Sequence, residues 1–226
     1  MSASGAIAPS GPRIFLLSPA NLGGERAALL VSPHAAFPLA QRVRARGGAP
    51  LGEVMSFLSG LYFRGKLAYG LTFAAPPSPR CPGVLVITPD RGLLPPETPV
   101  TLRALLAAGR VRISEKNATY RRALEASARG LSRRIGRDCE VVLLGSIASD
   151  KYTAVLSDVF GPRLRFPIDF VGRGDMSRGG LLLRCVAAQH ELAYVPLDGA
   201  VRHGQRPPRL TPLPGVLAAA VARARL

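Results

Sequence analysis

The chain has 226 residues, 47% of them hydrophobic, and carries a formal net charge of +16. This apolar content excludes a disordered chain, and the length suits one substantial core. The apolar runs are far shorter than the roughly 20 residues that a membrane span needs, and no secretory signal is visible. We therefore expect a soluble, cytoplasmic protein with no membrane partner.

Composition along the chain predicts three segments. Residues 1–12 are expected to form a flexible leader, and 13–200 a single α/β domain. Residues 201–226 are rich in proline and arginine and are expected to form a tail with a short final helix over 216–225.

The first predicted strand covers 13–17, a short apolar run typical of strands that are covered on both faces. It leads into a loop with Ser18, Asn21 and two glycines, followed by a predicted helix over 25–31. Backbone N–H groups of such a loop can face an anion, so Ser18 and Asn21 are candidate ligand-binding residues. The alternative is an ordinary tight turn between a strand and a helix.

Three more helices are predicted next, over 37–45, 52–59 and 61–73. In the last of them Gly65 is expected to break the helix just before Lys66. Aromatic residues surround Arg64, and basic residues among aromatic ones suit nucleotide contacts, so Arg64 and Lys66 are candidate phosphate ligands. A buried helix pair with a basic kink is the alternative.

The second predicted strand, 84–88, runs into the segment Thr88-Pro-Asp-Arg-Gly92. Ligands collect at the carboxyl ends of parallel strands, which makes Asp90 a candidate acid–base residue. The same pattern of proline, aspartate and glycine is also typical of a simple turn.

Two helices are predicted to follow, over 101–108 and 118–135, with Asn117 as the N-cap of the second. The third strand, 140–144, precedes a helix over 150–160. At the start of that helix, Lys151 is a candidate phosphate ligand and Tyr152 a candidate for stacking on a base. The alternatives are a simple helix-capping segment and a core tyrosine.

The most unusual segment is 169–180, with four glycines, two arginines, two aspartates and a serine between apolar flanks. Glycine lets the backbone approach a ligand closely, and forked guanidinium groups bind phosphate or carboxylate. Asp175 is the leading candidate for an acid–base residue. The candidate phosphate ligands are Arg173, Gly174, Ser177 and Arg178. A flexible surface loop is the alternative.

Weaker strands are expected at 163–166 and 192–195, and 181–189 suits either a buried helix or a strand. Strands that alternate with helices predict a mostly parallel sheet. We therefore expect a three-layer α/β fold, with a mostly parallel central sheet of about 4–5 strands and helices on both faces.

The positive charge has two interpretations. It predicts a polyanionic partner, most often nucleic acid. However, only three of the 30 basic residues are lysines (Lys66, Lys116 and Lys151), and Ala, Gly and Pro are abundant. Arginine richness of this kind equally suits a bias toward GC-rich codons.

Cysteine and histidine are too sparse to indicate a metal site. The three of each are widely spaced, so we expect no metal, no other cofactor and no disulfide framework. Neither a Ser-His-Asp order nor a GxSxG motif is recognisable, which disfavours covalent hydrolase chemistry.

Several short segments, taken in order, carry a resemblance. They are Leu17-Ser18, 63–69, 84–88 with 91–95, and Leu144-Gly145 with Lys151-Tyr152. In layout the chain resembles small bacterial and phage proteins related to the uracil-DNA-glycosylase-like α/β fold and to a domain of archaeosine-type tRNA-modification enzymes. The Asp-Pro-Tyr loop of true uracil glycosylases is not found, and Ile87-Thr-Pro-Asp-Arg-Gly stands where the pattern expects Ser-Ala-Lys-x-Gly. The resemblance implies the fold and a nucleobase- or nucleotide-related ligand.

These patterns predict an enzyme acting on a nucleoside, nucleotide or nucleobase, either free or within nucleic acid, with Asp175 or Asp90 as the acid–base group. Two alternatives stay open. One is a non-catalytic basic protein that binds nucleic acid through phosphate contacts. The other is a scaffold protein with no small-molecule site. The sequence indicates no oligomeric state.

Overall fold

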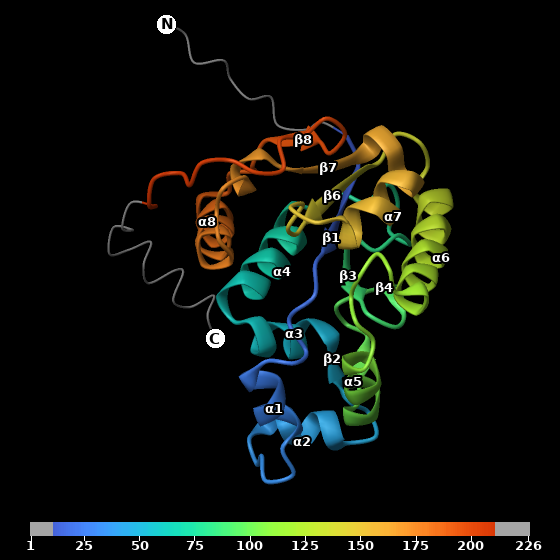
Figure 1. The fold of residues 1–226 in the computed structure, drawn as a ribbon, viewed down its shortest axis with the longest axis vertical. Coiled ribbons are helices and arrows are strands. Elements are labelled where there is room, and N and C mark those ends of the chain that lie inside the picture. Colours follow the sequence, from blue (N-terminus) through green and yellow to red (C-terminus); the bar gives the residue numbers. More distant parts are fainter. Residues whose placement is uncertain (1–10, 211–226) are drawn as a thin grey trace, which may run out of the picture.

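The computed structural model describes residues 11–210 (Figure 1). The strands in this range are β1 (Arg13–Leu17), β2 (Ala49–Pro50), β3 (Val84–Thr88), β4 (Gly92–Leu94), β5 (Pro99–Val100), β6 (Glu140–Leu144), β7 (Leu164–Pro167) and β8 (Tyr194–Pro196). The helices are α1 (Glu25–Val31), α2 (Pro38–Arg44), α3 (Leu51–Ser59), α4 (Leu61–Phe73), α5 (Leu102–Gly109), α6 (Ala118–Ile135), α7 (Asp150–Phe160) and α8 (Asp175–Ala188), with single 3-10 turns at η1 (Gly161–Arg163) and η2 (Ile168–Phe170).

The described residues form a central six-stranded sheet in the order β4-β3-β1-β6-β7-β8. Neighbouring pairs among β3, β1, β6 and β7 are parallel, whereas the edge strands β4 and β8 are antiparallel to their neighbours. The strands predicted at 13–17, 84–88 and 140–144 are confirmed with their bounds, and the weaker ones at 163–166 and 192–195 are confirmed approximately as β7 and β8.

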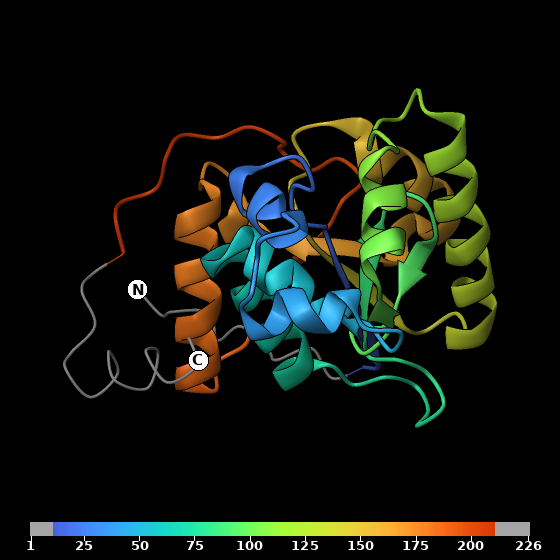
Figure 2. The same cartoon turned by 90° about the horizontal axis from the view of Figure 1, so that it is seen from below.

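Both faces of the sheet are covered. Successive strand side chains alternate between faces, so Phe15 and Leu17 join one apolar core, while Ile14 and Leu16 join the other. Helices α4 and α8 cover the first face, and α6 and α7 cover the second. Figure 2 shows α8 and α6 on opposite sides of the molecule. The three-layer α/β architecture expected from the sequence is confirmed, with six strands in place of about 4–5.

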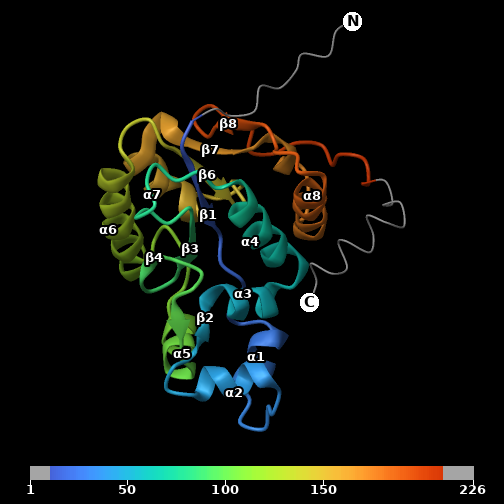
Figure 3. The same ribbon diagram turned by 180° about the vertical axis from the view of Figure 1, so that it is seen from behind.

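A smaller group of elements lies past the carboxyl end of β1. Strands β2 and β5 pair in antiparallel fashion, and α1, α2 and α5 lie below the main sheet in Figures 1 and 3. The apolar side chains of α1, α2 and α3 belong to the same core as α4. This placement encloses the carboxyl edge of the sheet, where the strand-end loops gather.

Helices α4 and α8 cross at two glycines. A Cβ atom on Gly65 would lie 2.7 Å from the carbonyl oxygen of Gly179, and one on Gly179 would lie 2.8 Å from the carbonyl oxygen of Leu61. The predicted break at Gly65 is wrong, because α4 is continuous from Leu61 to Phe73. Gly65 is needed for this close helix contact, and Gly60, just before α4, has the positive φ of 62°.

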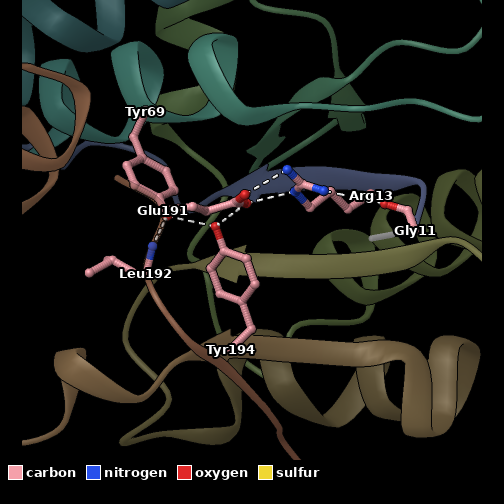
Figure 4. Close-up of polar contacts among 6 residues, drawn as sticks. All are labelled: Gly11, Arg13, Tyr69, Glu191, Leu192 and Tyr194. Atoms are coloured by element: carbon pink, nitrogen blue, oxygen red, sulfur yellow. Dashed lines mark hydrogen bonds and ion pairs between the residues drawn. The ribbon is translucent and has the colours of Figure 1, made fainter. Parts of the chain in front are cut away.

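A polar network fixes the amino end of β1 (Figure 4). Both Nε and Nη2 of Arg13 donate to the carboxylate of Glu191 at 2.6 Å, and Tyr194 Oη donates to the same carboxylate at 2.8 Å. Tyr69 Oη lies 2.6 Å from Tyr194 Oη and accepts the backbone N–H of Leu192 at 2.7 Å. The network joins β1, α4 and the approach to β8.

Other expectations concern segment 181–189, the cysteines and the two ends of the chain. Segment 181–189, which the sequence left open between helix and strand, belongs to α8 up to Ala188, and Gln189 is the C-cap. All three cysteines are buried, and no helix between residues 11 and 210 combines the length and apolarity needed to cross a membrane. The helix expected at 216–225 and most of the 1–12 leader lie outside the described residues.

Candidate functional site

A cavity of about 370 Å³ lies at the carboxyl ends of β1 and β6. Its polar lining comes from the segment after β1, the end of α3, the start of α4, the segment after β6 and the first turns of α7 and α8. These residues are Ser18, Asn21, Ser59, Tyr62, Ser146, Lys151, Tyr152 and Asp175. In parallel α/β sheets this edge is where ligands bind, because the loops after neighbouring strands meet there.

The two central strands bring their following loops into contact. The backbone N–H of Ser18 donates to the carbonyl oxygen of Leu144 at 3.2 Å, so β1 and β6 end side by side. A Cβ atom on Gly145 would lie 3.0 Å from Cβ of Ser18. Glycine at position 145 therefore leaves room for the Ser18 side chain between the two loops.

Lys66 is buried behind Ser18, with 1% of its surface exposed. Its Nζ donates to the carbonyl oxygen of Ser18 at 2.5 Å and lies 2.8 Å from the Ser18 hydroxyl. The same nitrogen lies 4.4 Å from the ring centroid of Tyr62 and 5.0 Å from that of Phe63. A lysine in such surroundings has lost most of the hydration that stabilises its charge.

Burial lowers the pKa of Lys66 from 10.5 to about 7. The carboxylate of Asp175 opposes this shift, whereas the positive charges of Arg178 and Lys151 add to it. A group that titrates near neutral pH can both take up and release a proton at low cost, which is the property that general acid–base catalysis requires.

Two tyrosines form part of the cavity wall. Tyr62 and Tyr152 are both almost fully buried, and burial raises the pKa of Tyr62 to about 12 and raises that of Tyr152 as well. Among the described residues, Tyr62 Oη has no hydrogen-bond partner of good geometry. The positive charge of the nearby Arg178 partly opposes the rise in the pKa of Tyr62. Both phenols are therefore neutral at physiological pH.

Two charged side chains border the same cavity from helix starts. Lys151 is in the first turn of α7, and its Nζ lies 5.1 Å from the ring centroid of Tyr152. Asp175 is in the first turn of α8, with 70% of its side chain exposed and a 3.5 Å contact to Arg178. The positive ends of both helix dipoles therefore lie at the cavity, where they favour negative charge.

The structure brings five of the predicted site residues together: Ser18, Asn21, Lys151, Tyr152 and Asp175 line the cavity. Lys66 contacts Ser18 from behind. Sequence reasoning missed Tyr62, although it lies four residues before Lys66 and so shares a helix face with it.

The segment predicted as a glycine/arginine loop is largely helical. Asp175 begins α8 and Gly174 is its N-cap, so 175–180 form helical turns instead of a loop. Gly172 has a φ of +72°, and a Cβ there would meet the carbonyl oxygen of Gln205. Backbone packing, here and at Gly179, therefore accounts for two of the four glycines.

The arginines of this segment are engaged with the protein itself. Arg178 donates from Nε and Nη2 to the carbonyl oxygen of Phe170, at 3.1 and 2.9 Å. Arg173 donates to the carbonyl oxygen of Asp169 at 3.0 Å and to the hydroxyl of Ser177 at 3.3 Å. These bonds hold the 3-10 turn η2 against the start of α8. Arg173, Gly174, Ser177 and Arg178 are outside the cavity lining.

Asp90 and Arg64 are placed elsewhere. Asp90 lies in the turn between β3 and β4, a short antiparallel hairpin, as the turn alternative predicted. Its nearest cationic partner is Arg91, with Nε 3.9 Å away, and its Oδ1 is buried with no hydrogen-bond partner among the described residues. Arg64 is on α4, and neither residue lines the cavity that contains Asp175.

A larger cavity of about 590 Å³ lies along α7 and includes Asp158, Asp198 and Arg202. None of the described residues that line it is a lysine, whereas Ser18 of the smaller cavity contacts the buried Lys66, so the smaller cavity is the better candidate for chemistry. Between residues 11 and 210 no group of three or more His, Cys, Asp or Glu side chains is placed to hold a metal ion.

Comparison of the chain with protein-family models, with curated proteins and with solved structures found no match. A function can therefore be inferred only from the position, volume and lining residues of the cavity.

Proposed function

We propose that the protein is an enzyme that acts on a nucleoside, nucleotide or nucleobase bound in the cavity at the carboxyl ends of β1 and β6. The observation that carries this proposal is that one cavity combines two buried tyrosines, a lysine at a helix start and Ser18, whose hydroxyl is in contact with the buried Lys66. A volume of about 370 Å³ is in the range of small-molecule sites.

The residues that line the cavity suit each part of such a ligand. A flat base suits the aromatic surfaces of Tyr62 and Tyr152, and the amide of Asn21 can pair with a base edge. A phosphate suits Lys151 at the start of α7, where the helix dipole adds to the attraction. Asp175 is the solvent-facing acid–base group of the proposal.

The resemblance to proteins of the uracil-DNA-glycosylase-like fold favours the same class of ligand. It implies a nucleobase- or nucleotide-related substrate, and the strand-end position of the cavity agrees with that implication.

Calorimetric titration of wild-type protein with bases, nucleosides and nucleoside monophosphates tests the proposal. Lys151→Met is expected to weaken monophosphate binding by about tenfold or more and to leave nucleoside binding nearly unchanged, because it removes only the phosphate contact. Lys116→Met is the matched control, since Lys116 is exposed and lies outside the cavity. Absence of saturable binding, or equal effects of both variants, would overturn the proposal.

A second candidate function, non-catalytic binding of nucleic acid, is favoured by the outer surface of α6. Its exposed arginines are Arg121, Arg122, Arg129, Arg133 and Arg134. Binding through such a surface releases counterions, so affinity for duplex DNA or tRNA would fall steeply with salt. Arg122→Ser with Arg133→Ser would then weaken nucleic-acid binding, whereas Lys151→Met would not.

A further inference from the structure

We propose that Ser18 is a nucleophile and that Lys66 is the base that takes its proton, so that the cavity performs acyl transfer on an ester or activated acyl substrate. This inference goes beyond the proposed function, because it concerns the reacting group and holds whether or not the substrate contains a nucleotide.

The geometry separates the roles of the two residues. Ser18 lines the cavity, whereas Lys66 is 1% exposed and is not part of the lining. Oγ of Ser18 lies 2.8 Å from Nζ of Lys66, within hydrogen-bond reach. Ser18, itself 5% exposed, therefore borders the space where a ligand would bind, while the lysine contacts its hydroxyl from the protein side.

The hydrogen bonds of the amine suit this role. A neutral amine keeps an N–H to donate to the carbonyl oxygen of Ser18, 2.5 Å away, and its lone pair can accept the proton of the Ser18 hydroxyl. Burial that lowers the pKa of Lys66 to about 7 supplies the neutral form at physiological pH. Once protonated, the ammonium group is stabilised by the rings of Tyr62 and Phe63.

The other serines of the cavity lack this contact. Ser59 and Ser146 also line it, but in the described part of the chain the hydrogen bonds of Lys66 Nζ go to Ser18. The Ser146 hydroxyl accepts from the backbone N–H of Ala148 at 3.4 Å. Position therefore selects Ser18 from three candidates.

The proposed reaction has two balanced steps. Oγ of Ser18 bonds to the acyl carbon as its proton passes to Nζ of Lys66, and the leaving alcohol takes that proton as its bond to the acyl carbon breaks. Water then gives a proton to Nζ of Lys66 as its oxygen bonds to the acyl carbon. The bond between that carbon and Oγ of Ser18 breaks as Lys66 returns the proton to Oγ, which releases a carboxylic acid and restores both residues. Negative charge on the acyl oxygen is favoured by the starts of α7 and α8 at the cavity.

This arrangement needs no histidine. Serine–lysine pairs perform the same task as a Ser-His-Asp triad, since the base only has to be unprotonated and within reach. The missing Ser-His-Asp order in the sequence therefore does not count against covalent chemistry at Ser18.

Labelling of the intact protein with a fluorophosphonate probe, mapped by peptide mass spectrometry, tests the proposal. We expect one adduct, on Ser18, with Ser59 and Ser146 in the same cavity as unlabelled internal controls. The labelling rate of wild type should rise with pH through about 7, following deprotonation of Lys66. Lys66→Met should slow labelling by about 100-fold or more and remove this pH dependence, whereas Lys116→Met should change neither.

The wild-type measurements decide the question even if Lys66→Met does not fold. No adduct, an adduct only on another residue, or a Ser18 labelling rate that shows no rise with pH near 7 would overturn the inference. So would unchanged labelling in a folded Lys66→Met protein. Nucleotide binding that persists when labelling fails would overturn this inference alone and leave the proposed function standing.

Discussion

Arg13 and Glu191 are 178 positions apart in the chain and form a paired contact, with two N–H groups of Arg13 each 2.6 Å from a carboxylate oxygen of Glu191 (Figure 4). Their side chains are only 12% and 9% exposed. The pair fastens the amino end of the central strand to the segment between α8 and β8. Because the pair is buried, removing one partner would leave the other charge poorly hydrated and would lower the free energy of unfolding.

We expect Glu191→Ala to lower the free energy of unfolding by about 3 kcal/mol, since it leaves Arg13 and Tyr194 without the carboxylate. Urea denaturation measures the change. Glu53→Ala is the control, because Glu53 pairs with Arg42 at the surface, where both side chains are more than 40% exposed. That loss should be below about 1 kcal/mol. Similar losses in the two variants would contradict the expectation.

Gly65→Ala should destabilise the protein by about 2 kcal/mol or more, because its Cβ would lie 2.7 Å from a backbone oxygen of α8. Gly130→Ala is the matched control in the middle of α6, where a Cβ meets no described atom within 4 Å. This control should stabilise the protein by about 0.5–1 kcal/mol through helix propensity. Thermal unfolding of both variants distinguishes the effect of the close contact between α4 and α8 from the effect of helix propensity.

Asn117→Ala should cost about 1 kcal/mol, because the Asn117 side chain accepts the backbone N–H groups of Thr119 and Tyr120 at 3.0 and 3.3 Å. Ser149 occupies the same N-cap position in α7 but makes no side-chain capping bond in the described structure. Ser149→Ala should therefore change the free energy of unfolding by only a few tenths of a kcal/mol. A larger loss from Ser149→Ala would show that α7 is capped in solution.

The stability of the protein should depend on pH through Lys66. Because its pKa is about 7 in the folded protein and 10.5 ordinarily, the unfolded chain binds more protons between these values. The free energy of unfolding of wild type should therefore rise relative to Lys66→Met by about 2 kcal/mol between pH 7 and 9, and level off below pH 7. A difference that stays constant across this range would mean that Lys66 is charged when folded.

Elements with longer apolar sequence patterns were predicted more accurately than short ones. The core strands β1, β3 and β6 were predicted with their bounds, because each contains four consecutive apolar residues. Strand β4 was missed, since three residues after a turn carry too little periodicity. The break expected at Gly65 failed because the glycine serves a contact with α8, a neighbour that local spacing does not reveal.

Site residues were predictable where they follow the carboxyl end of a parallel strand, because ligands bind at that edge of the sheet. Ser18 and Lys151 follow strands whose carboxyl ends meet, so their convergence could be expected from topology. The contact of Lys66 with Ser18 joins positions 48 residues apart on different elements, and it depends on how α4 packs against the sheet. Arg173 and Arg178 have the residue types of a phosphate site but bond to backbone carbonyls, which composition alone does not distinguish.

The central position of β1 has a consequence for biosynthesis. The ribosome makes this strand before either of its parallel neighbours, whose pairing residues begin at Val84 and Glu140. The edge of β1 that pairs with β6 therefore stays without its partner until well over half of residues 11–210 have been translated. Such long-range pairing slows folding and makes the nascent chain prone to aggregation before the second partner of β1 emerges.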